Sequence, residues 1–272
     1  MKTIIVATDF SPVSLNAAAY AVKMAKSLGA NILLFNVYEV IPNYGEIMIN
    51  VDVEIFKKSA KTEILKFRSE LLLQTNADFD IATEVRLGNF KDELRSLCEH
   101  VNPYAVVMGS QGKSAAEHML MGSHAGKTIS NFTWPVITVP PDITFSGIKK
   151  IGIAYDFEVA IEDDLIADIK LLAQDFHATI NILNVTREDE FDENFIFLSR
   201  MLAHSFKPFA VKYHFLSSAN TDDGILDFVN SNAVDLLIVM PKHHNLFQKL
   251  FHASHTKQLV LHCHVPVMSL SK

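Results

Sequence analysis

Val106-Val-Met-Gly109-Ser-Gln-Gly112 is the stretch that decides the fold class of this chain. Residues 105–108 form an apolar run that breaks at a glycine, which is typical of a buried strand that ends in a loop. Nine residues then separate Gly112 from Gly122-Ser123. Glycines let a ligand approach the backbone closely, and Gly122-Ser123 would open a helix whose free N–H groups favour an anion. The stretch therefore predicts a loop that holds phosphate.

Two nearby segments come close to the P-loop motif, but neither matches it. Gly122-Ser-His-Ala-Gly126-Lys127-Thr128 has three residues between its glycines where the motif needs four, and no strand pattern precedes it. Gly109-Ser-Gln-Gly112-Lys113-Ser114 follows a strand but has only two residues between its glycines. We therefore exclude a Walker-type site.

Predicted strands and helices alternate up to about residue 140. Residues 4–8 and 32–37 are apolar strands of the kind buried in a parallel sheet. Ser11 is placed to cap the helix between them, with Pro12 at its first position and Gly29 after its last. The later elements are a helix over about 56–75, an edge strand at 81–85, a helix capped by Asn89, the strand at 105–108, a helix over 123–131 and a strand at 136–139. This alternation predicts an α/β fold with a doubly wound, five-stranded parallel sheet.

The chain repeats itself after a turn-rich linker at residues 140–147. The segments 151–157, 178–185 and 236–240 echo 4–10, 30–37 and 105–108. We therefore expect two tandem domains of the same fold, over residues 1–141 and 148–272. In the second copy the glycine loop is replaced by Met240-Pro241-Lys-His-His244, where we equate Pro241 with the first glycine, and only Ser254 survives in register. The second domain is predicted to keep the fold and lose the phosphate loop, which leaves Asp156 as a helix cap.

The glycine spacing, two residues and then nine, resembles the nucleotide-binding signature of the universal stress protein family in its ATP-binding branch. The resemblance covers nearly the whole chain and implies the strand order 3-2-1-4-5, which brings Asp9 and Gly109 to one crevice where the strand order reverses. It also implies a set of nucleotide contacts in the first domain: Ala7, Thr8 and Asp9 at the adenine and ribose, Val37 at the adenine edge, Met108 and Gly109 at the ribose, Gln111 and Gly112 along the phosphates, and Gly122, Ser123 and His124 around the terminal phosphates. The alternatives are that Asp9 only caps the helix that follows, and that the glycine loop is a tight turn without a ligand.

Composition limits the partners of the chain. The net charge of −7 argues against nucleic acid or an anionic membrane as the main partner. Cys98 and Cys263 are the only cysteines, which fits a reducing compartment, and no apolar run is long enough to span a bilayer, so we expect a cytoplasmic protein. Among the 12 histidines, His252 and His255 are three residues apart and are candidate metal ligands, although chance clustering on the surface is the stronger interpretation.

These observations predict a regulatory protein that binds ATP, ADP or AMP in its first domain, with or without Mg²⁺. No activated nucleophile is evident, so the sequence predicts no dedicated catalyst, and any ATP hydrolysis would be slow and would depend on Gln111 or His124 to position water. An adenylyl-transfer enzyme would need a loop rich in serine and glycine after the first strand, which residues 8–11 lack. A nucleotide-free assembly module is the third candidate. The family resemblance further implies that the two domains pair through their last strands as a pseudo-dimer, and that whole chains form a homodimer.

Overall fold

The computed structural model describes residues 1–39, 53–78, 80–110, 132–185, 193–241 and 253–271. The first half of the chain contains β1 (Thr3–Ala7), α1 (Pro12–Leu28), β2 (Asn31–Tyr38), α2 (Val53–Thr75), β3 (Ile81–Leu87), α3 (Phe90–Val101), β4 (Ala105–Gly109) and β5 (Val136–Val139). The second half contains β6 (Lys150–Ala154), α5 (Asp163–Phe176), β7 (Thr179–Val185), α6 (Glu193–Ser205), β8 (Val211–Leu216), α7 (Thr221–Ser231), β9 (Leu236–Val239), α8 (Ala253–His262) and β10 (Val267–Ser269).

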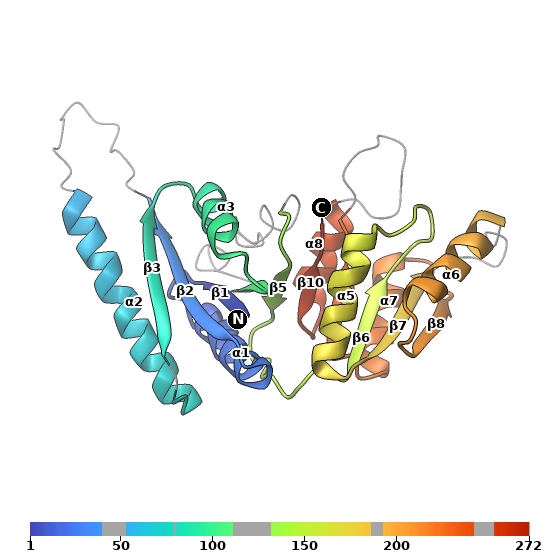
Figure 1. Ribbon diagram of the computed structural model, residues 1–272, viewed down its shortest axis with the longest axis horizontal. Helices are drawn as coiled ribbons and strands as arrows, with labels where there is room; N and C mark the ends of the chain where they lie inside the picture. Colours follow the sequence, from blue (N-terminus) through green and yellow to red (C-terminus); the bar gives the residue numbers. More distant parts are fainter. Residues whose placement is uncertain (40–52, 79, 111–131, 186–192, 242–252, 272) are drawn as a thin grey trace.

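The ten strands in the described residues form one sheet in the order β3-β2-β1-β4-β5-β10-β9-β6-β7-β8. Within each half every pairing is parallel, and the first half has the predicted order 3-2-1-4-5, which confirms the fold class. The second half has the same order and is joined to the first by the antiparallel pair β5–β10, so the predicted contact between the last strands is present. In Figure 1 the halves stand side by side, with β5 and β10 in the middle and α2 and α6 at the far ends.

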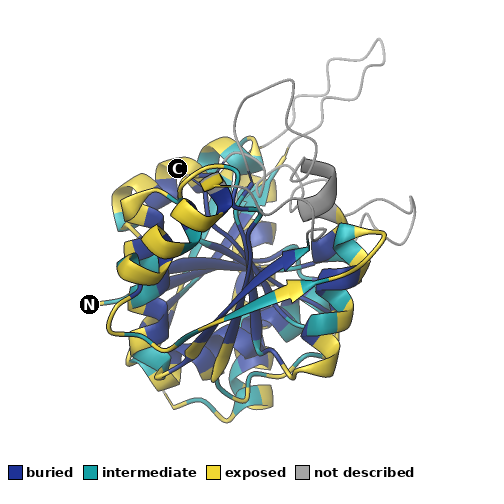
Figure 2. Ribbon diagram, turned by 90° about the vertical axis from the view of Figure 1, so that its right-hand side faces the viewer, coloured by how far each residue is buried: buried dark blue, intermediate teal, exposed yellow. Residues whose placement is uncertain are grey.

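Two hydrophobic layers cover the two faces of the sheet. Successive strand residues point to opposite faces, so Ile4 and Val6 belong to the layer that α1, α2, α5 and α6 cover, while Ile5 and Ala7 belong to the layer that α3, α7 and α8 cover. Figure 2 shows the inner strands as a buried centre and the exposed residues on the outer sides of the helices, whereas the edge strand β8 is partly exposed. The sheet is therefore a rigid frame that fixes where each strand ends.

The helix caps predicted from the sequence are present in the first half. Ser11 is the N-cap of α1, with its side chain accepting from the Ser14 amide, and Gly29 closes the helix in the left-handed conformation at φ 61°. Asn89 caps α3 through the Lys91 amide at 3.0 Å. The edge strand β3 runs two residues further than predicted, to Leu87, because it pairs with β2 along its full length. The predicted helix over 123–131 lies outside the described residues.

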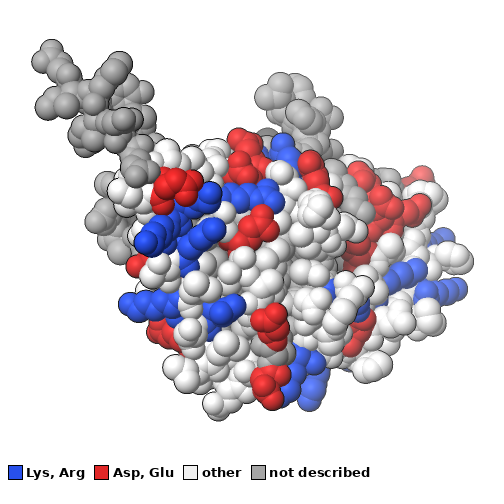
Figure 3. All heavy atoms as spheres, turned by 60° about the vertical axis from the view of Figure 1, so that its left-hand side comes forward, with Lys and Arg blue, Asp and Glu red and all other residues white. Residues whose placement is uncertain are grey.

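Basic and acidic side chains are intermixed on the face of the molecule shown in Figure 3. Within the part of the chain that the structure describes, no helix is both long and apolar enough to cross a bilayer.

Candidate functional site

Three of the predicted contact residues come together at the carboxyl ends of adjacent strands. Val37 lies near the end of β2, Asp9 follows β1 and Gly109 ends β4, and these strands are neighbours in the order β2-β1-β4. The connection from β1 leads to β2 on one side, whereas β4 lies on the other side and is reached only after β3. The strand order therefore reverses between β1 and β4, which is where open α/β sheets bind ligands.

The turn after β1 is held by a compact set of hydrogen bonds. The Asp9 carboxylate accepts from the Ser11 amide at 3.0 Å, and the Thr8 hydroxyl accepts from the Phe10 amide at 3.0 Å. Ser14 donates its hydroxyl proton to the Ser11 carbonyl, so the 2.9 Å contact between the Thr8 and Ser14 hydroxyls is donated by Thr8. Phe10 has a φ of 61°, a left-handed conformation that costs energy for a bulky residue and needs this support. Asp9 is thus fixed in place, and Ser11 rather than Asp9 caps α1.

Val37 presents its backbone groups to the space above the end of β1. The Phe35 carbonyl accepts from the Thr8 amide at 2.9 Å, and backbone groups of alternate strand residues face the same neighbour. Val37 therefore directs its N–H and C=O past the last residue of β1. Asn36, which is buried, donates to the Thr8 carbonyl at 2.8 Å and so ties the end of β1 to β2.

Ala7 and Met108 form the floor of this region. Both are 5% exposed and lie in one hydrophobic cluster with Phe35. Their side chains support the strand ends from the α3 side, so any contact that they make with a ligand is limited to a small part of their surface.

Gly109 has a packing reason to be glycine. A Cβ atom at this position would lie 2.9 Å from Val13 Cγ1 and 3.3 Å from the Val13 carbonyl carbon and oxygen. The first turn of α1 therefore packs directly on the backbone of β4. Close packing explains this glycine without a ligand, but it also brings the start of α1 to the reversal point between β1 and β4.

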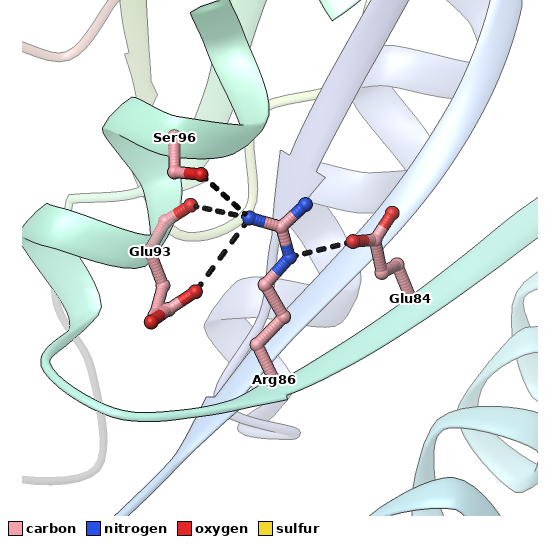
Figure 4. A network of polar contacts seen from close by, with 4 residues as sticks. All are labelled: Glu84, Arg86, Glu93 and Ser96. Atoms are coloured by element: carbon pink, nitrogen blue, oxygen red, sulfur yellow. Dashed lines mark hydrogen bonds and ion pairs between the residues drawn. The ribbon is translucent and has the colours of Figure 1, made fainter. Parts of the chain in front are cut away.

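Arg86, which sequence reasoning did not single out, braces the strand next to Val37. The two residues are partners in the β2–β3 register. Arg86 Nε donates to Glu84 at 2.6 Å, and Nη1 contacts the Glu93 carbonyl at 3.3 Å and the Ser96 hydroxyl at 3.3 Å (Figure 4). The sequence did carry a signal for this contact: an arginine inside an edge strand, with acidic residues on the same strand and on the next helix. Arg86 fixes α3 against β3 and thereby supports the end of β2.

The other predicted site residues are those of the glycine loop and the histidine pair. Gln111, Gly112, Gly122, Ser123 and His124 lie outside the described residues, and so does His252. The backbone at His255 belongs to α8. Among the described residues there is no group of three His, Cys, Asp or Glu side chains that could hold a metal ion, and the His252 and His255 pair stays a hypothesis.

The second half repeats the turn after β1 in its backbone. The Asp156 carboxylate accepts from the Glu158 amide at 3.2 Å, Asn184 donates to the Tyr155 carbonyl at 2.9 Å, and Phe157 has a φ of 57°. Asp156 does not cap α5, because that helix begins only at Asp163 and its N-cap is Glu162. The predicted capping role of Asp156 is therefore wrong, and the residue stabilises the turn instead.

The helix after this turn differs between the halves. α1 starts two residues after Phe10 and has no acidic residue in its first turn, whereas α5 starts six residues after Phe157 and has Asp163 and Asp164 there. Asp156, Glu158 and Glu162 add three more carboxylates before α5, while Asp9 is the only one between residues 7 and 15. A helix N-terminus attracts anions, and these added carboxylates oppose that attraction. The second half is consequently unfavourable for phosphate.

Strand register corrects one sequence equivalence. Ile4 pairs with Ala105 and Ile151 pairs with Leu236, so Gly109 corresponds to Met240. The proposed match of Pro241 with Gly109 is wrong by one residue, because two apolar runs of different length cannot fix their own register. A methionine therefore replaces the glycine on which α1 packs in the first half.

The strand orders and strand-end turns define a tandem, doubly wound α/β protein. A sequence model of the Universal stress protein family matches residues 1–140 and 199–270. The chain belongs to the universal stress protein family.

Individual relatives agree with this assignment. A universal stress protein of Methanocaldococcus jannaschii is 30% identical over 141 residues, which cover 51% of this chain and 81% of that protein. Universal stress protein G of Salmonella typhimurium is 29% identical over 147 residues, covering 51% of this chain and 98% of that protein. The crystal structure of a universal stress protein from Archaeoglobus fulgidus aligns over 99% of this chain and 98% of its own, with a TM-score of 0.71 and 18% identity, which shows a shared fold.

Proposed function

We propose that this chain is a regulatory protein that binds ATP or a related adenine nucleotide, with or without Mg²⁺, in its first half. The observation that carries the proposal is the convergence of Asp9, Val37 and Gly109 on the reversal point between β1 and β4. The Asp9 carboxylate can accept from a ribose hydroxyl or an exocyclic amine, and the Val37 N–H and C=O offer an adenine edge the complementary donor and acceptor. The glycine spacing from Gly109 to Gly122 adds the predicted phosphate loop.

The proposal assigns different roles to two domains, residues 1–141 and 148–272. The first would bind the nucleotide, and the second would keep the fold as a structural or signalling partner. The five carboxylates between residues 156 and 164 support this division, because they would repel the phosphates of a nucleotide in the second half. The two cysteines are buried free thiols, which is compatible with the proposed cytoplasmic location. A homodimer of whole chains stays a prediction from the family resemblance.

Asp9→Ala and Asp156→Ala form a matched pair that tests the proposal. Each variant removes a carboxylate that accepts one amide two residues later, so both should lose about 1 kcal/mol of unfolding free energy. Only Asp9→Ala should weaken nucleotide binding, by about tenfold in Kd, because only Asp9 would contact the ligand. Calorimetric titration with ATP and urea unfolding measure both effects. Unchanged binding in Asp9→Ala, or equal weakening in the two variants, would contradict the site.

A further inference from the structure

The two halves are related by a local two-fold axis at the β5–β10 contact. Val136 and Val267 occupy equivalent positions, since each pairs with the second residue of its neighbouring parallel strand. The antiparallel register places Ile137 opposite Met268 and Val136 opposite Ser269. Ile137 and Met268 are themselves equivalent, so the axis passes between them. Each position that one half brings to this junction therefore has an equivalent position in the other half, on the other side of the axis.

Hydrogen bonds identify which residues correspond on the strand side of the junction. The Tyr104 amide donates to the Thr3 carbonyl at 2.8 Å just before β4, and the Asp235 amide donates to the Lys150 carbonyl at 2.9 Å just before β9. Thr3 begins β1 and Lys150 begins β6. Tyr104 in the first half is thus the equivalent of Asp235 in the second.

Helix ends identify the facing residues. The α1 cap amide of Gly29 bonds the Ala25 carbonyl, and the α5 cap amide of His177 bonds the Ala173 carbonyl. Tyr20 lies nine residues before Gly29, and Asp168 lies nine residues before His177. Tyr20 and Asp168 are therefore equivalent positions on the helices. As at the pair Tyr104 and Asp235, the first half has a tyrosine where the second half has an aspartate.

Tyr104 of the first half meets acids of the second half. Tyr104 and Asp168 line the same cavity of about 640 Å³ at the junction, together with Lys2. Lys2 Nζ contacts the Asp175 carboxylate at 2.5 Å and lies 5.0 Å from the centre of the Tyr104 ring. Burial raises the pKa of Tyr104, and the nearby Asp175 and Asp168 carboxylates raise it further. A tyrosine, which stays neutral, thus faces the carboxylates.

The two-fold axis places Tyr20 of the first half near Asp235 of the second. Burial raises the pKa of Tyr20, and the Asp235 carboxylate adds to that effect, as the symmetry requires. Tyr20 also packs edge-on against the linker residue Phe145, with ring centres 5.1 Å apart. On both sides of the axis the first half supplies the tyrosine and the second half supplies the aspartate.

We propose that this Tyr/Asp exchange makes the inner face of the second half select a first half as its partner and reject a copy of itself. Two second halves joined through the same strand contact would bring Asp168 against Asp235, two half-buried carboxylates that repel each other. Two first halves would bring Tyr20 against Tyr104, without a carboxylate on either side. The chain therefore closes on itself rather than pairing like halves between copies. This inference does not depend on nucleotide binding.

Full-length variants can test the exchange by compensation. Tyr104→Asp recreates the like-half contact by placing a carboxylate against Asp168, so the urea midpoint should fall. Adding Asp168→Tyr restores an unlike pair in the reverse sense and should recover at least about fivefold in the unfolding equilibrium constant beyond the sum of the single effects. Tyr104→Asp with Asp163→Tyr has the same composition and net charge, but Asp163 lies in the first turn of α5, and it should show no such recovery.

Equal behaviour of the two double variants would overturn the proposal, whether both recover or neither does. If Tyr104→Asp does not fold, a milder double-mutant cycle replaces it. Tyr104→Phe should then be coupled to Asp168→Asn and uncoupled from Asp163→Asn, and no coupling in either cycle would contradict the proposed contact.

Discussion

The strand-end turns after β1 and β6 share a backbone but differ in the helix that follows. Both turns hold an aspartate against an amide two residues later and place a phenylalanine in the left-handed conformation. In the first half α1 begins at once, is capped by Ser11 and packs on Gly109. In the second half α5 begins later, among carboxylates, and Met240 occupies the position of the glycine.

The comparison teaches that a duplicated fold can be preserved while the charge and packing at its strand ends change. The shared elements, such as Asn36 and Asn184 donating to the preceding strand, stabilise the sheet and the turn in both halves. The differing elements would affect the binding of a phosphate group: the position where the helix starts, the number of carboxylates beside it, and the glycine at the end of the strand. These differences support the proposal that only the first half binds a nucleotide.

Replacing Gly112 should have the largest effect. A leucine at this position would block the close approach of phosphate to the predicted loop, so nucleotide binding should be lost. Urea unfolding should change little, because Gly112 lies beyond Gly109, where β4 ends. Calorimetric titration with ATP measures the loss, and binding that persists unchanged would show that the loop does not hold phosphate.

Gly109→Met should have an intermediate effect, because it gives the first half the residue found in the second. The new Cβ would collide with Val13, so the free energy of unfolding should fall by about 1–3 kcal/mol, and the displaced α1 start should weaken nucleotide binding. Thermal unfolding and titration measure the two effects. The reverse change, Met240→Gly, is the control and should not create a second binding site, since the carboxylates around α5 remain. A second site in that variant would mean that the glycine alone decides.

Without nucleotide, thiol labelling should show little difference between the halves. Burial raises the pKa of Cys98 to about 12 and that of Cys263 to about 11, so both thiols should be protonated and unreactive in the native protein at pH 8. Their folded pKa values lie above the unfolded value, so this contribution to stability is complete below about pH 8.5 and is lost as the pH rises toward about 11 for Cys263 and about 12 for Cys98.

Saturating nucleotide sharpens this comparison, because Cys98 belongs to the first half and Cys263 to the second. If only the first half binds, nucleotide at about 100 times its Kd should slow Cys98 labelling by up to about 100-fold and slow Cys263 labelling less. Mass spectrometry of the labelled peptides gives both rates. Equal protection of the two thiols would contradict the idea that the halves respond separately.

Sequence reasoning predicted the parts of the fold that depend on local signals. The Ser11 and Asn89 caps, the Gly29 stop and the strand order implied by the family resemblance all agree with the structure. The match of Pro241 with Gly109 was wrong because register depends on pairing between distant strands. The hydrogen bond from Asn36 to the Thr8 carbonyl was not predicted. Its signal was a polar residue in an apolar strand, which recurs as Asn184 in the second half.

Other features could not be predicted because they exist only in three dimensions. The contact between Gly109 and Val13 joins residues 96 positions apart, and no pattern in either segment predicts it. The Tyr/Asp exchange requires knowledge of which residues correspond across the two-fold axis. The late start of α5 was hidden by the strong resemblance between residues 151–157 and 4–10, which made the two turns look alike beyond the point where they diverge.

The most direct test of the central claim is the number of nucleotides that one chain binds. Denatured extracts of the purified protein should be analysed for adenine nucleotide, and the nucleotide-free protein should then be titrated with ATP in the presence of Mg²⁺. The account predicts one nucleotide per chain, bound by the first half. Two nucleotides per chain would contradict the loss of binding in the second half, and none would contradict the site itself and favour an assembly module.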